Sequence, residues 1–344
     1  MKHKNEVNAK KIAELTGVSL STVSIVLNNR GDEFRISAKT SEKVLETANR
    51  LGYHPVKREK HKTKKSNKSL ICIFLPNDLD ASPIGQFLEN VIKYLHDQKL
   101  QYEIILFPYE SGKLKEKAAW ISKEFILGAV LMALTEDDIK FIENSSFNVP
   151  VVLYNRTAKG YCSVLNDDYS LGSKAMNHFI KRGHTRFAII SPGYSSRALS
   201  LRGVGYMDRF RSQNFNPDVE AFIHPTIFNE ANDMGGYEAM QHLIKSEKMP
   251  TAIFVLADNM VSGVVRCIKD YGLEVPRDIE IISYGNKAIN YIIKPSITSF
   301  APPLEQMSCN CIKILHSAIV SGTLVDSVKL SFEAECIFRE SCPE

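Results

Sequence analysis

A very short link between two helices near the N-terminus constrains the fold of this chain more than any other feature. Gly17 ends a first helix, because glycine adopts the left-handed conformation at little steric cost. Ser19 then caps a second helix over 20–28, so only three residues separate the two helices. Ser37 caps a third helix. Residues 7–55 therefore predict three packed helices, of which the first two form a helix-turn-helix unit.

Apolar residues recur on one face of each helix, as the packing of three short helices requires. We expect the core to consist of Ile12, Ala13 and Leu15 of the first helix, Val23, Val26 and Leu27 of the second, and Val44, Leu45 and Ala48 of the third.

The outward face of the second helix carries hydroxyl groups and two apolar side chains: Leu20, Ser21, Thr22, Ser24 and Ile25. Hydroxyl groups at a helix N-terminus bind phosphates or base edges, and Leu20 can lie on a thymine methyl. In the alternative reading, these Ser and Thr residues are ordinary caps and solvated positions.

The distribution of charge favours DNA as the partner. Residues 1–68 contain 16 Lys/Arg and 7 Asp/Glu, a net charge of +9, whereas the rest contains 27 basic and 32 acidic residues, a net charge of −5. A basic module on a mildly acidic body is typical of nucleic-acid binding. A basic tail on an unrelated protein would explain neither the short turn nor the helix caps. The sequence therefore predicts a module that binds double-stranded DNA.

The remaining chain alternates short apolar runs with amphipathic segments. We expect buried strands at 69–76, 102–108, 128–134, 150–154, 186–191, 252–257 and 279–283, and helices at 87–98, 170–181, 237–245 and 259–271. This alternation predicts parallel sheets with crossover helices. About 270 residues exceed one typical core, so we expect two α/β lobes with a ligand cleft at the carboxyl ends of their strands.

Several stretches resemble the lactose repressor (LacI/GalR) family of bacterial transcription factors. The headpiece likeness lies in KKIAELTGVSLSTVSIVLNNR (10–30) and ISAKTSEKVLETANRLGYHP (36–55). It continues in VPVVLYNR (149–156), NDDYSLGSKAMNHFIKRGHTRFAIISP (166–192), MPTAIFVLADNMVSGVV (249–265), GLEVPRDIEIISYGN (272–286) and KPSITSFAPPLEQM (294–307).

The resemblance implies an N-terminal all-α helix-turn-helix headpiece and a two-lobed α/β periplasmic-binding-protein-like domain, with parallel sheets flanked by helices. The implied divisions are a headpiece at 1–56, a basic linker at 57–68, and an effector-binding and dimerisation domain at 69–344, with an N-lobe at about 69–163 and 297–328 and a C-lobe at about 164–296 and 329–344.

For the headpiece and linker, the resemblance implies DNA contacts at Asn8, Ser19, Thr22, Ser24, Asn28, Ser37, Thr40 and Tyr53, to which we add Leu20, Ser21, Ile25, Lys57, Arg58 and Lys62. Many relatives carry Arg where this chain has Ile25, so an operator sequence does not transfer. In the family the linker folds into a hinge helix, and a Leu wedges into the minor groove. That Leu position falls on Lys62, so we predict phosphate contacts with little bending of the DNA.

For the cleft, the resemblance implies polar side chains of both lobes around a small-molecule effector, with a sugar as the first expectation. The candidates are Asn77, Asp78, Asn155, Arg197, Arg202, Phe228, Asp258, Tyr284 and Asn286. Arg197 is preferred to Arg202, although an Arg that merely covers the lobe surface explains it equally well.

Two family residues of the cleft are missing. Ala257 replaces an Asn, and Gly285 replaces the Asp that grips sugar hydroxyls or purine nitrogens. Three alternatives follow: the effector is atypical, other side chains such as Asn286, Tyr284, Asn77 or Asp78 rebuild the clamp, or the sensor has lost its ligand.

The remaining motifs argue against an enzyme. His and Cys residues show no metal-ligand spacing, and neither a Ser nucleophile elbow nor a phosphate-cradling glycine loop occurs, so we expect no metal and no cofactor. No apolar run suits a membrane span, and the N-terminus lacks the apolar core of a signal peptide. We expect a cytoplasmic homodimer that acts as a repressor by default, although the sequence does not decide between repression and activation. The rival is a solute-binding protein or a sugar-handling enzyme of the same fold. The headpiece and the lack of an export signal argue against the first, and the lack of a phosphate-cradling glycine loop argues against a kinase.

Overall fold

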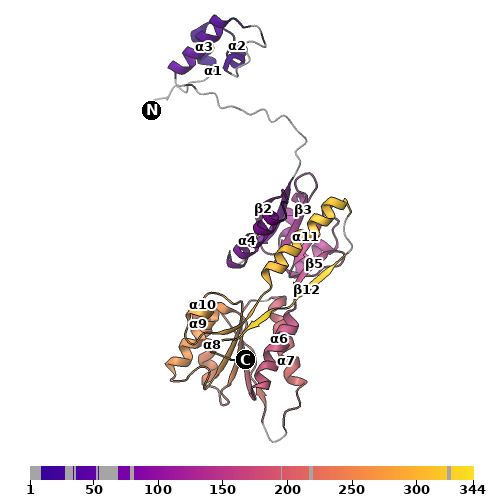
Figure 1. Ribbon diagram of the computed structural model, residues 1–344, viewed down its shortest axis with the longest axis vertical. Coiled ribbons are helices and arrows are strands. Elements are labelled where there is room, and N and C mark those ends of the chain that lie inside the picture. Colours follow the sequence, from indigo (N-terminus) through magenta and orange to yellow (C-terminus); the bar gives the residue numbers. More distant parts are fainter. Residues whose placement is uncertain are drawn as a thin grey trace. The chain divides into compact units, whose positions relative to one another are not determined.

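The chain forms two separate compact units, Met1–Asn67 and Lys68–Glu344 (Figure 1). The computed structural model describes residues 9–27, 34, 36–51, 53, 69–77, 81–194, 196–216, 220–323 and 327–344. The predicted linker at 57–68 lies outside these residues.

The first unit contains the three predicted helices, α1 (Ala9–Thr16), α2 (Leu20–Leu27) and α3 (Ala38–Arg50). Its core consists of Ile12, Val23, Val26, Val44 and Ala48, each at most 3% exposed. The helix-turn-helix prediction is therefore confirmed.

Two of the predicted core residues of this unit are wrong. Leu15 is 48% exposed and Leu45 is 42% exposed. The buried residues of each helix are three or four positions apart, and Thr16 and Thr47 take inner positions beside Ile12 and Val44. Thr16 can be buried because its hydroxyl donates to the carbonyl oxygen of Ile12 at 2.7 Å.

The N-lobe of the second unit is a six-stranded sheet between two helical layers, with strand order β12-β5-β4-β3-β1-β2. All its strand pairs are parallel. Its elements are β1 (Leu70–Pro76), α4 (Ala81–Asp97), β2 (Glu103–Tyr109), η1 (Leu114–Trp120), β3 (Gly128–Met132), α5 (Glu136–Glu143), β4 (Val151–Tyr154), β5 (Cys162–Asn166), α11 (Leu304–Ser321) and β12 (Lys329–Phe332). Helices α4 and α11 cover one face of the sheet, side by side although far apart in sequence, and η1 and α5 cover the other (Figure 1).

The C-lobe is likewise a sheet between helical layers, with strand order β13-β11-β10-β9-β6-β7, and β8 also pairs with β6. Its strand pairs are parallel except for the antiparallel pair of β11 with β13. Its elements are α6 (Asp168–Lys181), β6 (Arg186–Pro192), α7 (Arg197–Arg211), β7 (Phe222–Ile223), β8 (Ile227–Asn229), α8 (Asp233–Ile244), β9 (Ala252–Val255), η2 (Asp258–Met260), α9 (Val261–Asp270), β10 (Glu280–Tyr284), α10 (Ile289–Ile292), β11 (Thr298–Ala301) and β13 (Glu335–Ile337). Helices α6 and α7 cover one face, and α8 and α9 cover the other. The predicted class, parallel sheets flanked by helices, is confirmed.

The chain crosses between the lobes three times, at places that differ from the prediction. Strand β5 stays in the N-lobe up to Asn166, β11 belongs to the C-lobe, and β12 belongs to the N-lobe. The predicted boundaries at about 163, 297 and 328 were therefore wrong by one short strand each. Pairing decides these strands: Thr298 lies beside Ile282 of β10, and Lys329 lies beside Ser163 of β5.

A buried carboxylate stabilises the C-lobe. Glu280 accepts two hydrogen bonds from Arg182, at 2.7 and 2.6 Å, and one from the thiol of Cys342 at 3.1 Å. His184 Nε2 lies 3.0 Å from the same carboxylate. Although burial raises the pKa of Glu280, the hydrogen bonds from His184, Arg182 and Cys342 lower it to about 2. Glu280 therefore remains ionised in the interior.

No helix among the described residues is both long and apolar enough to span a membrane.

Candidate DNA-binding surface and effector cleft

The turn of the headpiece is built from local hydrogen bonds that the sequence predicted. Gly17 has a φ of +70°, and its N–H donates to the carbonyl oxygen of Ala13 at 2.9 Å. The Ser19 hydroxyl accepts the backbone N–H of Thr22 at 3.1 Å. The Ser37 hydroxyl does the same for Thr40 at 3.2 Å. These caps fix where α2 and α3 begin.

The predicted reading face of α2 points to solvent. Leu20, Ser21 and Ser24 are exposed, and Thr22 and Ile25 are half-buried. Val23 and Val26 occupy the opposite, buried face. Ser19 and Ser37 are also exposed, whereas Thr40 and Tyr53 are half-buried and Tyr53 packs against the headpiece core. Asn8, Asn28, Lys57, Arg58 and Lys62 lie outside the described residues.

In the second unit, most of the polar side chains predicted to hold an effector already bind the protein itself. Asn155 follows β4, and its Oδ1 accepts the N–H of Asn166 at 3.1 Å. Asn286 follows β10, and its Oδ1 accepts from Arg339 Nη2 at 2.6 Å. Both asparagines have a φ near +54°, which Asn tolerates better than most residues. The positive φ angles and these internal hydrogen bonds therefore account for an asparagine at both positions without a ligand.

Arg202 is also engaged within the protein. Its Nε donates to Asp168 Oδ1 at 2.8 Å, and its Nη1 donates to the carbonyl oxygen of Leu256 at 3.3 Å. Its guanidinium carbon lies 3.3 Å from the ring centre of Tyr284. Burial raises the pKa of Tyr284 to about 12, although the charge of Arg202 opposes this shift. An ion pair and a cation–π contact thus occupy two predicted effector residues, Arg202 and Tyr284.

Asp258 fills the space beside Gly285. Its Oδ2 accepts the N–H of Lys287 at 2.8 Å, and its Oδ1 accepts from Asn290 Nδ2 at 3.0 Å. Gly285 has a φ of +132°, and a Cβ atom there would lie 2.7 Å from Asp258 Oδ2. Any side chain at position 285 would therefore collide with the Asp258 carboxylate. Gly285 therefore fits the present position of Asp258.

Three predicted effector residues remain available. Asn77 and Phe228 are exposed, at the carboxyl end of β1 and on β8. Arg197 is the first residue of α7 and is half-buried; within the described part of the chain it makes no hydrogen bond and no ion pair. Asp78 lies outside the described residues.

The sequence reasoning missed two charged residues at the lobe boundary. Asp168 begins α6 and is the partner of Arg202. Arg156 follows Asn155 at the end of β4, and its side chain is only 15% exposed. Arg156 could have been predicted as a site residue, because it comes directly after Asn155 at the end of a predicted strand. The ion pair of Asp168 with Arg202 could not have been predicted from local sequence, because the two residues are 34 positions apart.

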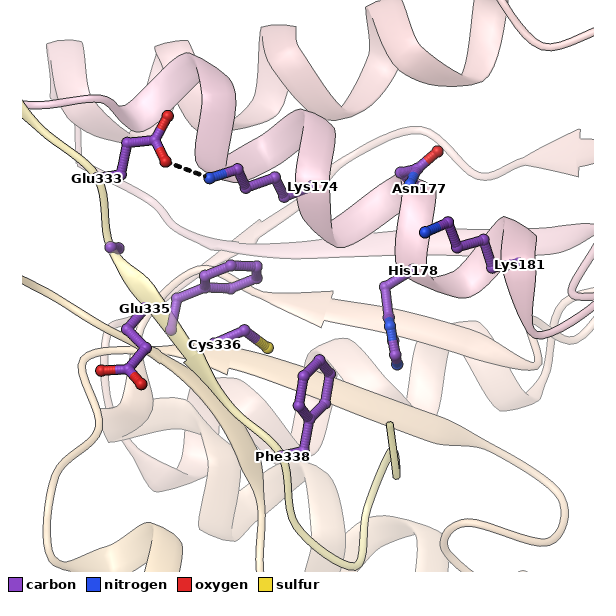
Figure 2. A pocket seen from close by; sticks show the side chains of 10 residues that line it. Lys174, Asn177, His178, Lys181, Glu333, Glu335, Cys336 and Phe338 are labelled. Atoms are coloured by element: carbon purple, nitrogen blue, oxygen red, sulfur yellow. Dashed lines mark hydrogen bonds and ion pairs between the residues drawn. The ribbon is translucent and has the colours of Figure 1, made fainter.

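A groove of about 510 Å³ lies elsewhere on the C-lobe, between α6 and the segment 333–338 around β13 (Figure 2). The ion pair of Lys174 with Glu333, at 2.6 Å, bridges its two walls. Cys336 and Phe338 face the groove from the β13 side. Of the predicted effector residues that the structure describes, none lines it.

Comparison with known proteins identifies both units. Residues 9–56 match the model for bacterial regulatory proteins of the lacI family, and residues 176–342 match the periplasmic binding protein-like domain. The HTH-type transcriptional repressor PurR of Actinobacillus pleuropneumoniae serotype 3 (strain JL03) is 24% identical over 336 residues, which cover 96% of this chain and 97% of PurR. The chain belongs to the LacI family. The resemblance inferred from the sequence is confirmed.

Other relatives of this LacI-family chain are also named as regulators. Catabolite control protein A of Priestia megaterium is 25% identical and covers 96% of this chain and 97% of that protein. The probable HTH-type transcriptional repressor ExuR of Bacillus subtilis (strain 168) is 27% identical, with coverage of 97% and 98%. The chain is thus a DNA-binding transcriptional regulator, and these relatives are regulators rather than enzymes.

Solved structures share the fold of this LacI-family chain. The lac repressor dimer bound to operator and the anti-inducer ONPF matches with a TM-score of 0.68 and 19% identity, covering 98% of this chain and 99% of that one. The complex of the transcriptional regulator CelR with cellobiose gives a TM-score of 0.66 and 22% identity, with coverage of 98% and 100%.

Proposed function

We propose that this chain is a cytoplasmic, homodimeric repressor whose affinity for operator DNA is controlled by a small, sugar-like molecule held between the two lobes. The observation that carries the proposal is the headpiece, where α2 buries Val23 and Val26 and turns Leu20, Ser21 and Ser24 to solvent. The related structures of the lac repressor with operator DNA and of the regulator CelR with cellobiose support both partners.

The exposed face of α2 suits the major groove. A helix in that groove places its N-terminal residues on base edges, and the surrounding hydroxyl groups contact phosphates. We propose DNA contacts for the predicted set, which includes Ser19, Ser37, Thr40 and Tyr53 of the described headpiece. The excess of +9 charges in residues 1–68 supports strong binding to phosphates.

An exposed apolar edge of the N-lobe supports the homodimer. Strand β2 is the edge strand of its sheet, and Ile105 and Leu106 on it are about 40% exposed. Trp120 and Phe125 extend this patch, with ring centres 4.8 Å apart, and both are also more than 40% exposed. An uncovered apolar edge strand is a pairing surface. We propose a second copy of the chain as its occupant.

The DNA-binding proposal is tested by selecting duplexes from a random pool with the full chain. Affinity for the selected duplex should fall about 10³-fold as salt rises from roughly 50 to 200 mM. Ser21→Glu should weaken binding about 100-fold, because it places a carboxylate against the base edges. Gln306→Glu, which adds the same charge to exposed α11, is the control. Selection of no duplex sequence, or equal losses in both variants, would contradict the proposal.

The dimer is tested by sedimentation of the full chain. Leu106→Glu should convert it to a monomer, whereas Ile292→Glu, at another exposed apolar position on α10, should leave it dimeric. A dimer that survives Leu106→Glu would show that the β2 edge is not the interface.

A second candidate is a regulator of the same kind that has no effector. The internal partners of Asn155, Arg202, Asp258 and Asn286 favour it, because each of these side chains is bonded without a ligand. A measurement of effector binding by thermal unfolding separates the two candidates.

A further inference from the structure

Two arginines at the lobe boundary lack the partners that buried guanidinium groups normally have. Arg156 comes from the carboxyl end of β4 in the N-lobe, and Arg197 begins α7 in the C-lobe. A guanidinium carries five N–H donors and stays charged in proteins. Buried donors of this kind are almost always hydrogen-bonded.

Arg156 is the stronger anomaly. Its side chain is 15% exposed, and among the described residues it makes no hydrogen bond; its Nη1 atom is fully buried and unsatisfied. Its nearest carboxylate oxygen is Oε1 of Glu136, at 3.9 Å, and the Glu136 side chain is 76% exposed. An ion pair of that length with an exposed partner contributes little. Arg156 therefore remains a poorly compensated charge.

Arg197 adds a second positive charge near the first. It forms no ion pair within the described residues, although it is half-buried. Burial lowers the pKa of Arg156, Glu136 opposes this shift, and the charge of Arg197 lowers the pKa further. Both charges are positive, so an anion bound to both would reduce their repulsion.

Two buried carboxylates of the C-lobe are already engaged within the protein. Asp168 is bound to Arg202 and Asn166, and Asp258 is bound to Lys287 and Asn290. Carboxylates accept hydrogen bonds from sugar hydroxyl groups, and neither of these two is free to do so. This cleft offers guanidinium donors instead.

We propose that the effector is a small organic anion, and that its phosphate or carboxylate group is held jointly by Arg156 of the N-lobe and Arg197 of the C-lobe. The inference rests on the proposed effector cleft and names its ligand class. Because each arginine comes from a different lobe, the anion would also favour one arrangement of the lobes over another.

The test measures thermal unfolding of the full chain at constant ionic strength, with about 10 mM D-glucose, D-gluconate, D-glucose 6-phosphate or inorganic phosphate. A probe present at about 100 times its Kd should raise the midpoint by roughly 5 °C. We expect that rise from at least one anion and not from glucose. A rise with gluconate assigns the contact to a carboxylate, and a rise with either phosphate assigns it to a phosphate.

Three variants show where the anion binds, because the basic headpiece also attracts anions. Arg156→Gln and Arg197→Gln should each abolish the rise. Arg211→Gln, at the other end of α7, should keep it. Without any anion, Arg156→Gln should itself raise the midpoint by about 2 °C, since it removes an unpaired charge.

The inference is overturned if no anion raises the midpoint, if glucose raises it equally, if the rise survives either substitution, or if Arg156→Gln lowers the midpoint of the free protein. Operator binding is measured on the same preparations. If operator binding persists while anions fail, the anion inference fails alone; if operator binding is absent, the proposed function fails.

Discussion

The buried ion pair between Asp168 and Arg202 gives the sharpest test of how the C-lobe is held together. Their side chains are 1% and 6% exposed, so water solvates neither charge. Asp168→Asn retains an oxygen that can accept from Asn166 but leaves the guanidinium without its counter-charge. Removing one partner of a buried pair typically costs about 3 to 5 kcal/mol, and the retained hydrogen bond places the expected loss near about 3 kcal/mol.

A second ion pair on the same helix provides the matched control. Lys174 and Glu333 lie 2.6 Å apart, and their side chains are 46% and 64% exposed. Lys174→Gln should cost less than about 0.5 kcal/mol, because solvent screens an exposed pair. The contrast between the two substitutions on α6 isolates burial as the cause.

Urea unfolding of the full chain, followed by far-ultraviolet circular dichroism, measures both losses without screening the charges. Asp168→Asn should also lower the thermal midpoint by about 8 °C. The double variant Asp168→Asn with Arg202→Gln should recover part of the loss, since the orphaned charge is gone. Equal losses for Asp168→Asn and Lys174→Gln, or no recovery in the double variant, would refute the reasoning.

Three further predictions concern other sites. Folding lowers the pKa of Glu280 from 4.5 to about 2, so its ionised form stabilises the fold by about 3 kcal/mol above pH 4.5. This contribution should disappear as the pH falls from 4.5 towards 2. Urea titrations should show the free energy of unfolding decreasing over this pH range in the native chain, and decreasing less in Glu280→Gln. Gly285→Ala should cost about 3 kcal/mol, since its Cβ meets a carboxylate and its φ is unfavourable, whereas Gly203→Ala on α7, with nothing within 4 Å, should stabilise by up to about 1 kcal/mol; thermal midpoints that moved the same way would contradict this. Ser37→Ala should cost the headpiece about 1 kcal/mol by removing the cap of α3, and unchanged headpiece unfolding in calorimetry would count against that role.

Local patterns were enough to predict the interior strands and the headpiece. Buried parallel strands such as Leu70–Pro76 are continuous apolar runs, and Ser19 and Ser37 lie at helix starts, so both signals are contained in neighbouring residues. Leu15 and Leu45 were wrongly assigned to the core. The buried face of each helix is narrower than the apolar pattern in the sequence, so both leucines lie at the edge of that face and are exposed.

The missed elements depend on partners far along the chain. Strands β5, β11 and β12 are short, and the polar residues in CSVLN, TSFA and KLSF hide the strand pattern. Their lobe is decided by pairing, as when Lys329 meets Ser163. The effector cleft also depends on residues that are distant in sequence. The family motif located Asn155, Arg202, Asp258 and Asn286, but only the three-dimensional structure shows that these side chains already form hydrogen bonds within the protein.

The three crossings between the lobes have a consequence for how the protein is made. The N-lobe sheet lacks an edge strand until Lys329–Phe332 emerges from the ribosome, and the C-lobe sheet lacks one until Glu335–Ile337 follows. The headpiece is a separate unit made of local contacts, and it is fully synthesised long before either of these edge strands. A nascent or prematurely terminated chain therefore carries a folded headpiece on an unfinished body.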